Sequence, residues 1–131
     1  MADTLDFLAG KHCLVLDDEF LIALDIQQIL EAAGAASVVS VSTAQAAIAA
    51  VAERAIDLAV LDVRLTGSGG GGLAVANSLL RKGIAFVFLT GMRSDDEHTR
   101  AFPGIPVVEK PYLAPLLLDA LRQALVPPPH R

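Results

Sequence analysis

The chain has 131 residues, 53% of them hydrophobic and 19% charged, which is enough for one folded domain and too few for two. Ten Lys and Arg residues against fifteen Asp and Glu residues give a net charge of −5, which argues against a protein that binds nucleic acid through a basic surface. The single cysteine, Cys13, excludes an intrachain disulfide and a cysteine-rich zinc site. The N-terminal acids and the short apolar runs, such as Ile84–Leu89, predict neither an export signal nor a membrane span. We expect a cytoplasmic protein.

The beginning of the chain predicts a strand followed by an amphipathic helix. His12–Leu16 is a short apolar run with acidic residues after it, as expected of a strand. Phe20–Ala33 places apolar residues at helical spacing, and Gly34 suits the left-handed position that follows a helix. We expect the core-facing stripe of this helix to consist of Ile22, Ile26 and Ile29.

Three further elements follow before the middle of the chain. Ser37–Val41 is rich in β-branched residues and predicts a second strand. Ser42 or Thr43 is suited to cap an alanine-rich helix that runs to about Glu53. Leu58–Leu61 predicts a third strand.

A glycine-rich segment, Thr66–Gly72, opens the second half, and we expect a flexible loop because glycine loses the most backbone entropy on ordering. It is not a nucleotide-binding loop, since Leu73 stands where a lysine is needed. Leu73–Arg81 predicts a helix that Gly83 ends, and Phe86–Leu89 predicts a strand buried on both faces.

The last part of the chain predicts a short helix, a strand and a long helix. These cover Asp95–Ala101, Pro106–Glu109 and Leu113–Val126, and three prolines follow the last of them. Strands that alternate with helices favour an α/β fold in which helices cover both faces of a parallel sheet.

Polar residues follow the predicted strands. Asp17, Asp18 and Glu19 come after the first strand, Asp62 after the third, Thr90 after the fourth, and Lys110-Pro111 after the fifth. Ligands of open parallel sheets bind outside the carboxyl ends of the strands, so we expect these side chains to converge there. We assign Glu19 no role beyond that of an acid in the first turn of the following helix.

Grouped carboxylates repel one another unless a cation lies among them, and oxygen ligands suit a hard ion such as Mg²⁺. A carboxylate beside bound Mg²⁺ can attack a phosphorus atom, because the metal neutralises the phosphoryl oxygens. Lys110 and Thr90 are placed to bind the remaining oxygens.

On these residues the chain resembles the receiver domains of response regulators, over nearly its whole length. The family's acid pair matches Asp17 and Asp18, its phosphoacceptor Asp62, its hydroxyl residue Thr90, and its Lys-Pro pair Lys110-Pro111. The resemblance implies a flavodoxin-like, doubly wound sheet of five parallel strands in the order 2-1-3-4-5. It also implies a single receiver domain over residues 1–131, with no output domain.

The resemblance further implies a Mg²⁺-dependent phosphorelay. Asp62 accepts a phosphoryl group from a histidine kinase or a histidine phosphotransfer protein, and the signal passes on through protein binding. By the same resemblance, we expect Asp18, Asp62 and the backbone carbonyl of Arg64 to bind Mg²⁺ and Asp17 to act mostly through water. The Lys110-Pro111 peptide is expected to be cis.

Some positions depart from the family pattern. Thr66 replaces a common proline, although the expected Gly70 is present. The segment Phe88-Leu89-Thr90-Gly91 resembles a subgroup with a Phe-Ala-Thr-Gly-Tyr motif. Val107 stands where a switching Tyr or Phe is usual, so we expect the signal to travel without that aromatic ring.

Two alternative functions remain. The first is a degenerate pseudo-receiver that only binds partners. The second is an aspartyl-phosphate phosphohydrolase similar to haloacid dehalogenases, which is less favoured because Arg64 occupies the place of that family's second acid.

The first and last helices carry more apolar residues than a core-facing stripe needs. Phe20, Leu21 and Leu24 widen the apolar surface of the first helix, and Leu118 and Leu125 do so on the last. These leucines either pack against one another or form a homodimer interface.

Overall fold

The structure is a computed structural model that describes residues 7–62, 71–91 and 102–126. In chain order, the described elements are β1 His12–Leu16, α1 Phe20–Ala32, β2 Ser37–Val41, α2 Ala44–Glu53, β3 Leu58–Asp62, α4 Gly71–Lys82, β4 Ala85–Thr90, β5 Val107–Glu109 and α6 Ala114–Leu125. The predicted bounds of the first two strands and of the second helix are confirmed, and the other described elements shift by one or two residues at their ends. The predicted short helix over residues 95–101 lies outside the described residues.

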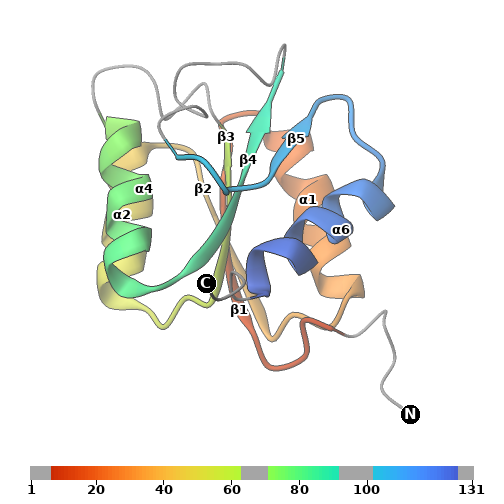
Figure 1. Cartoon of the computed structure of the whole chain (residues 1–131), viewed down its shortest axis with the longest axis horizontal. Coiled ribbons are helices and arrows are strands. Elements are labelled where there is room, and N and C mark those ends of the chain that lie inside the picture. Colours follow the sequence, from red (N-terminus) through yellow and green to blue (C-terminus); the bar gives the residue numbers. More distant parts are fainter. Residues whose placement is uncertain (1–6, 63–70, 92–101, 127–131) are drawn as a thin grey trace.

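All five strands are parallel and lie in the order β2-β1-β3-β4-β5 (Figure 1). The predicted strand order is therefore confirmed. Leu16 at the end of β1 pairs with Leu61 of β3, and Asp62 pairs with Leu89 of β4. This register brings the carboxyl ends of the central strands to one edge of the sheet.

The sheet is covered by α1 and α6 on one face and by α2 and α4 on the other (Figure 1). Successive residues of a strand point to opposite faces, so Cys13 and Val15 join the α1 and α6 core while Leu14 and Leu16 join the α2 and α4 core. Burial on both faces explains why β1, β3 and β4 are nearly continuous apolar runs in the sequence. Cys13 is buried in β1.

The core-facing stripe of α1 differs from the predicted one. The buried residues are Ala23, Ile26 and Leu30, whereas Ile22 and Ile29 are partly buried at the margin of the same core. The start of α1 is apolar all round, so helical spacing alone did not define which side faces the sheet. Packing against the sheet selects that side.

Residues with capping side chains or a left-handed backbone flank several of the helices. The Thr43 Oγ1 atom accepts a hydrogen bond of 3.1 Å from the backbone N–H of Ala46, which makes Thr43 the N-cap of α2. Gly34 and Gly83 follow α1 and α4 with φ of +100° and +71°, a region that favours glycine.

The predicted glycine loop is partly wrong. Gly71 and Gly72 form the first residues of α4 rather than part of a loop, and residues 66–70 lie outside the described ranges. Packing of Val75, Ala76 and Leu79 against the sheet offsets the entropy cost of two glycines in the first turn. Within the described parts of the chain, no helix has the length and apolar character needed to cross a membrane.

Candidate phosphoryl and metal site

Three carboxylates meet at the carboxyl edge of the sheet. Asp17 and Asp18 follow β1, and Asp62 is the last residue of β3. One carboxylate oxygen from each residue lies within 4.8 Å of those of the other two. Asp17 and Asp62 are buried, and Asp18 is exposed, so the cluster opens to solvent on the side of Asp18.

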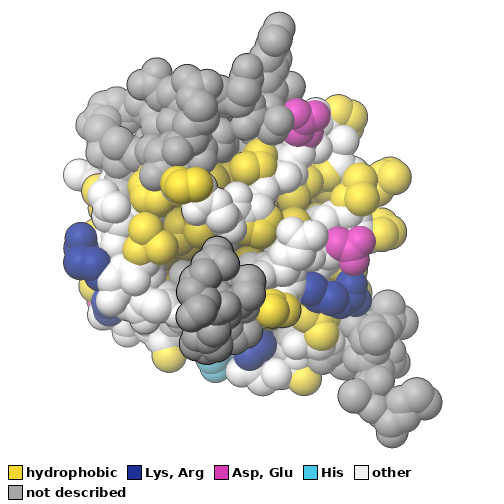
Figure 2. Space-filling view, in the orientation of Figure 1, with side chains coloured by type: hydrophobic (Ala, Val, Ile, Leu, Met, Phe, Trp, Pro, Cys, Tyr) yellow, Lys and Arg dark blue, Asp and Glu magenta, His cyan; other side chains and the backbone are white. Residues whose placement is uncertain are grey.

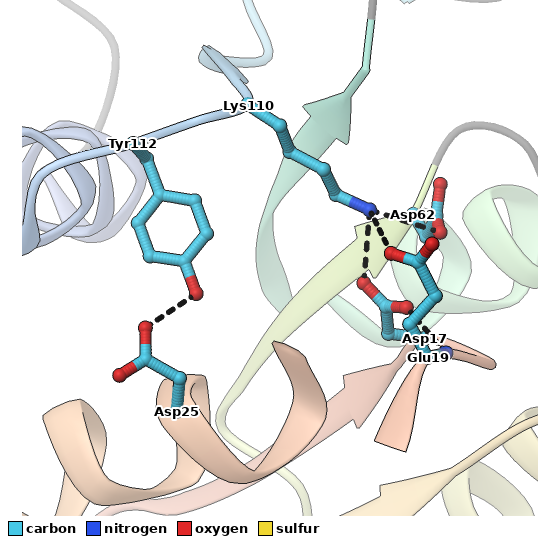
Figure 3. A network of polar contacts seen from close by, with 6 residues as sticks. All are labelled: Asp17, Glu19, Asp25, Asp62, Lys110 and Tyr112. Atoms are coloured by element: carbon cyan, nitrogen blue, oxygen red, sulfur yellow. Dashed lines mark hydrogen bonds and ion pairs between the residues drawn. The ribbon is translucent and has the colours of Figure 1, made fainter. Parts of the chain in front are cut away.

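Lys110 points into this cluster from the segment that follows β5 (Figure 3). Its Nζ atom lies 3.2 Å from Asp17 Oδ2, 3.4 Å from Asp62 Oδ2 and 3.7 Å from Glu19 Oε1. Its backbone N–H donates to the Thr90 carbonyl over 2.7 Å, which anchors the segment to the end of β4. The site therefore joins β1, β3, β4 and β5.

The charges of the cluster are coupled. Burial raises the pKa of Asp17 above its ordinary value of 3.8, and the Asp62 charge adds to this, while the Glu19 N–H and Lys110 lower it. Burial alone lowers the pKa of Lys110, but the charges of Asp62 and Asp17 outweigh that effect and raise it above 10.5. Lys110 therefore stays positively charged near neutral pH and offsets part of the negative charge.

The donor set fits a hard divalent cation. Three carboxylate oxygens close together are the ligands that Mg²⁺ prefers, and one ammonium leaves the four side chains with a net negative charge. Two of the acids are buried, where uncompensated carboxylates are costly. A bound Mg²⁺ would relieve the remaining repulsion.

The structure brings together Asp17, Asp18, Asp62 and Lys110 among the predicted site residues. Thr90 is buried at the end of β4 and is linked to Lys110 through its carbonyl. Arg64 lies outside the described residues. The Lys110-Pro111 peptide is cis, as the family resemblance implied.

Glu19 corrects one expectation. It occupies the N-cap position of α1 rather than the first turn, and its carboxylate lies near Lys110. Its backbone N–H donates to Asp17 Oδ1 over 2.9 Å. The sequence signal for this contact was the position of Glu19 directly after the acid pair. Its partner Lys110 is 91 positions away (110 − 19 = 91), so local sequence did not reveal the contact.

A second contact was not predicted. Tyr112 lies two residues beyond Lys110, and its hydroxyl donates to Asp25 Oδ2 on α1 over 2.8 Å (Figure 3). No local pattern pairs residues that are 87 positions apart. Val107, by contrast, lies in β5 as a partly buried side chain packed against the α2 and α4 core.

The comparisons with known proteins agree with this geometry. A structure of a response regulator receiver protein from Sinorhizobium medicae WSM419 superposes with a TM-score of 0.77 at 28% identity, covering 88% of this chain and 94% of that one. SdrG from Sphingomonas melonis Fr1 superposes with a TM-score of 0.72 at 35% identity, covering 88% of this chain and 97% of its own. A BeF3-activated conformation of SdrG, from Pseudomonas melonis Fr1, gives 0.73 at 36% identity, covering 90% and 98%.

No curated protein sequence matches this chain. The family model for the response regulator receiver domain matches residues 13–122, which contain Asp17, Asp18, Asp62, Thr90 and Lys110. With this match over most of its length, the sheet order and the related structures, the chain belongs to the family of response regulator receiver domains.

Proposed function

We propose that this protein is a phosphorelay response regulator in which Asp62 accepts a phosphoryl group from a phosphohistidine. Receiver domains belong to two-component signalling and are in general signalling proteins rather than enzymes with a separate substrate. The observation that carries the proposal is the convergence of Asp17, Asp18 and Asp62 with Lys110 at one edge of the sheet. The donor is a histidine kinase or a histidine phosphotransfer protein.

In the proposed reaction, a carboxylate oxygen of Asp62 attacks the phosphorus, a new P–O bond forms, and the P–N bond to the donor's imidazole breaks. The nitrogen keeps the electron pair of that bond. When bound, Mg²⁺ would be held by Asp18, Asp62 and the Arg64 carbonyl, with Asp17 acting mostly through water, and it would neutralise charge on the phosphoryl oxygens. The Lys110 ammonium, 3.4 Å from Asp62 Oδ2, is positioned to bind one of those oxygens. We assign the Thr90 hydroxyl to another.

The BeF3-activated conformation of SdrG supports this chemistry for a related receiver. BeF3⁻ bound to a carboxylate has the tetrahedral shape and the charge of a phosphoryl group. Phosphohydrolase activity of the haloacid dehalogenase type is disfavoured because Arg64 stands where that chemistry needs a second acid. A pseudo-receiver is disfavoured because each side chain that the reaction needs is present.

The test is incubation of the protein with Mg²⁺ and acetyl phosphate, followed by intact mass measurement. We expect one added phosphoryl group, absent in Asp62→Asn. A matched control is Asp57→Asn, because Asp57 precedes the same strand at its opposite end and keeps an oxygen to accept from the His12 N–H. An unmodified parent protein under these conditions would favour the pseudo-receiver.

We further propose that a homodimer forms through α1 and the start of α6. The exposed large apolar side chains there are Phe20, Leu21, Leu24, Leu113 and Leu116. Figure 2 shows hydrophobic side chains protruding over the start of α6. Large apolar side chains exposed at the starts of both helices are costly to leave in water, which supports an interface at this place.

A further inference from the structure

We propose that Tyr112 is a positioning residue for Lys110, and that it acts through the hydrogen bond that its hydroxyl donates to Asp25. The inference rests on the proposed function, since it assigns a residue that supports Lys110 at the same site. It adds a second support, outside the acidic cluster, to the lysine that contacts the phosphoacceptor.

The segment between β5 and α6 consists of residues 110–113 and is held at three points. The Lys110 N–H is bonded to the Thr90 carbonyl, and its side chain reaches Asp17 and Asp62. Two residues later, the Tyr112 hydroxyl reaches Asp25 in the second turn of α1. Figure 3 shows both side chains directed from this segment toward the stretch that begins at Asp17. Lys110 contacts this stretch at Asp17 and Tyr112 contacts it at Asp25, and these two contacts restrict how far residues 110–113 can move away from it.

The Lys110 contacts are long enough to depend on that restriction. Ammonium-to-carboxylate hydrogen bonds are typically about 2.7–2.9 Å, whereas those of Lys110 measure 3.2 and 3.4 Å. Because a lysine side chain is flexible, a fixed backbone limits the positions that its ammonium samples. A shift of the segment away from the two acids would lengthen contacts that are already at the upper limit of hydrogen-bond distance.

Tyr112 is suited to this task in two respects. Its ring is partly buried and packs against the core between the sheet, α1 and α6, so the hydroxyl is held in one direction. Burial and the charges of Asp25 and Asp17 raise the pKa of Tyr112, which keeps the hydroxyl protonated as a donor. Tyr112→Phe removes the donor and keeps the packed ring, so it separates positioning from packing.

The first experiment reads Lys110 directly and does not depend on phosphorylation. The chain has three lysines, Lys11, Lys82 and Lys110, so labelling lysine with ¹³C at Cε gives a spectrum with three signals. The Lys110 signal is identified by its loss in Lys110→Met. In Tyr112→Phe and in Asp25→Ala we expect it to move toward the positions of the other two, because the ammonium leaves the carboxylates.

Three further variants sharpen this test. The double variant of Tyr112→Phe and Asp25→Ala should move the signal no further than either single change, because both remove the same bond. Asp25→Asn keeps an acceptor oxygen and should retain the parental signal. Asp119→Ala removes an exposed α6 carboxylate that pairs with Arg122, and it should leave Lys110 unaffected. An unmoved Lys110 signal in Tyr112→Phe would overturn the inference.

The second experiment measures phosphorylation by acetyl phosphate with saturating Mg²⁺. Loss of one hydrogen bond predicts a rate lower by about threefold to tenfold in Tyr112→Phe and Asp25→Ala. We expect no additional loss in the double variant and near-parental rates in Asp25→Asn. Multiplying effects in the double variant would contradict the positioning role. An unphosphorylated parent protein would refute the proposed function instead, while the lysine spectrum would still decide the role of Tyr112.

Discussion

The Lys110 ammonium places a positive charge at the acidic cluster, and its effect on Mg²⁺ binding can be measured. Its ammonium lies 3.2 Å from Asp17 and 3.4 Å from Asp62, so it competes electrostatically with a divalent ion. We expect Lys110→Met to lower the Mg²⁺ dissociation constant by about threefold to tenfold. Isothermal calorimetry at neutral pH measures this change. Lys82→Met is the matched control, because that lysine bonds the Val51 carbonyl between α2 and α4. Unchanged or weaker Mg²⁺ binding in Lys110→Met would contradict the competition.

The Asp17 carboxylate already has a partner at each of its two oxygens. Asp17 accepts from the Glu19 N–H at Oδ1 and from Lys110 at Oδ2, which supports a role through water rather than direct ligation. We expect Asp18→Ala to weaken Mg²⁺ binding more than Asp17→Ala does. Calorimetry on both variants checks this order, and an equal loss would show that the assignment of the two acids is wrong.

The only tyrosine of the chain gives a direct measure of pH dependence. Burial and Asp25 raise the pKa of Tyr112 above its ordinary value of 10.0, so the folded protein keeps a proton that the unfolded chain releases. The contribution of Tyr112 to stability is therefore complete below pH 10 and declines as the pH rises above it. Tyrosinate absorbance should titrate near pH 10 in urea and at higher pH in the folded state. Equal midpoints in the two states would refute this shift, and in Asp25→Asn the folded midpoint should decrease.

At the scale of single elements, α1 shows how packing selects one face of an apolar helix. Leu30 is fully buried, although the spacing of isoleucines did not include it, and Ile29 is only partly buried. We expect Leu30→Ala to lower the free energy of unfolding by about 2–4 kcal/mol and Ile29→Ala by about 1 kcal/mol. Urea denaturation measures both values. The reverse order would show that the predicted stripe was right.

At the scale of the whole molecule, the same helix and α6 share one face of the sheet and expose apolar side chains at the end near the acidic cluster. Leu118 and Leu125 are partly buried against the core, so the packing alternative holds for them. Leu21 and Leu116 are 76% and 57% exposed, so they are the better positions at which to test a dimer. We expect the parent protein to scatter light as a dimer and the combined Leu21→Glu and Leu116→Glu variant as a folded monomer. A parent protein that is monomeric at high micromolar concentration, with and without acetyl phosphate, would refute the dimer.

The strands and the residues at their ends were predictable because they depend on local sequence. The apolar run His12–Leu16 and the β-branched segment Ser37–Val41 were therefore located with the correct bounds. Once the sheet order follows from the family resemblance, the ends of the strands must meet at one edge. The positions of Asp17, Asp62 and Lys110 near one another follow from that order without any side-chain detail.

Contacts between distant segments were decided only by the tertiary structure. Helical spacing did not choose the buried side of α1, since its first turns are apolar all round and packing against the sheet made the choice. The contact of Glu19 with Lys110 and the bond between Tyr112 and Asp25 join residues about ninety positions apart. Periodicity and capping act over a few residues, so they carry no information on which distant side chains meet. The sequence by itself determined which elements form and where the acids emerge, and the packing of helices on the sheet determined how the second turn of α1 reaches the segment that carries Lys110.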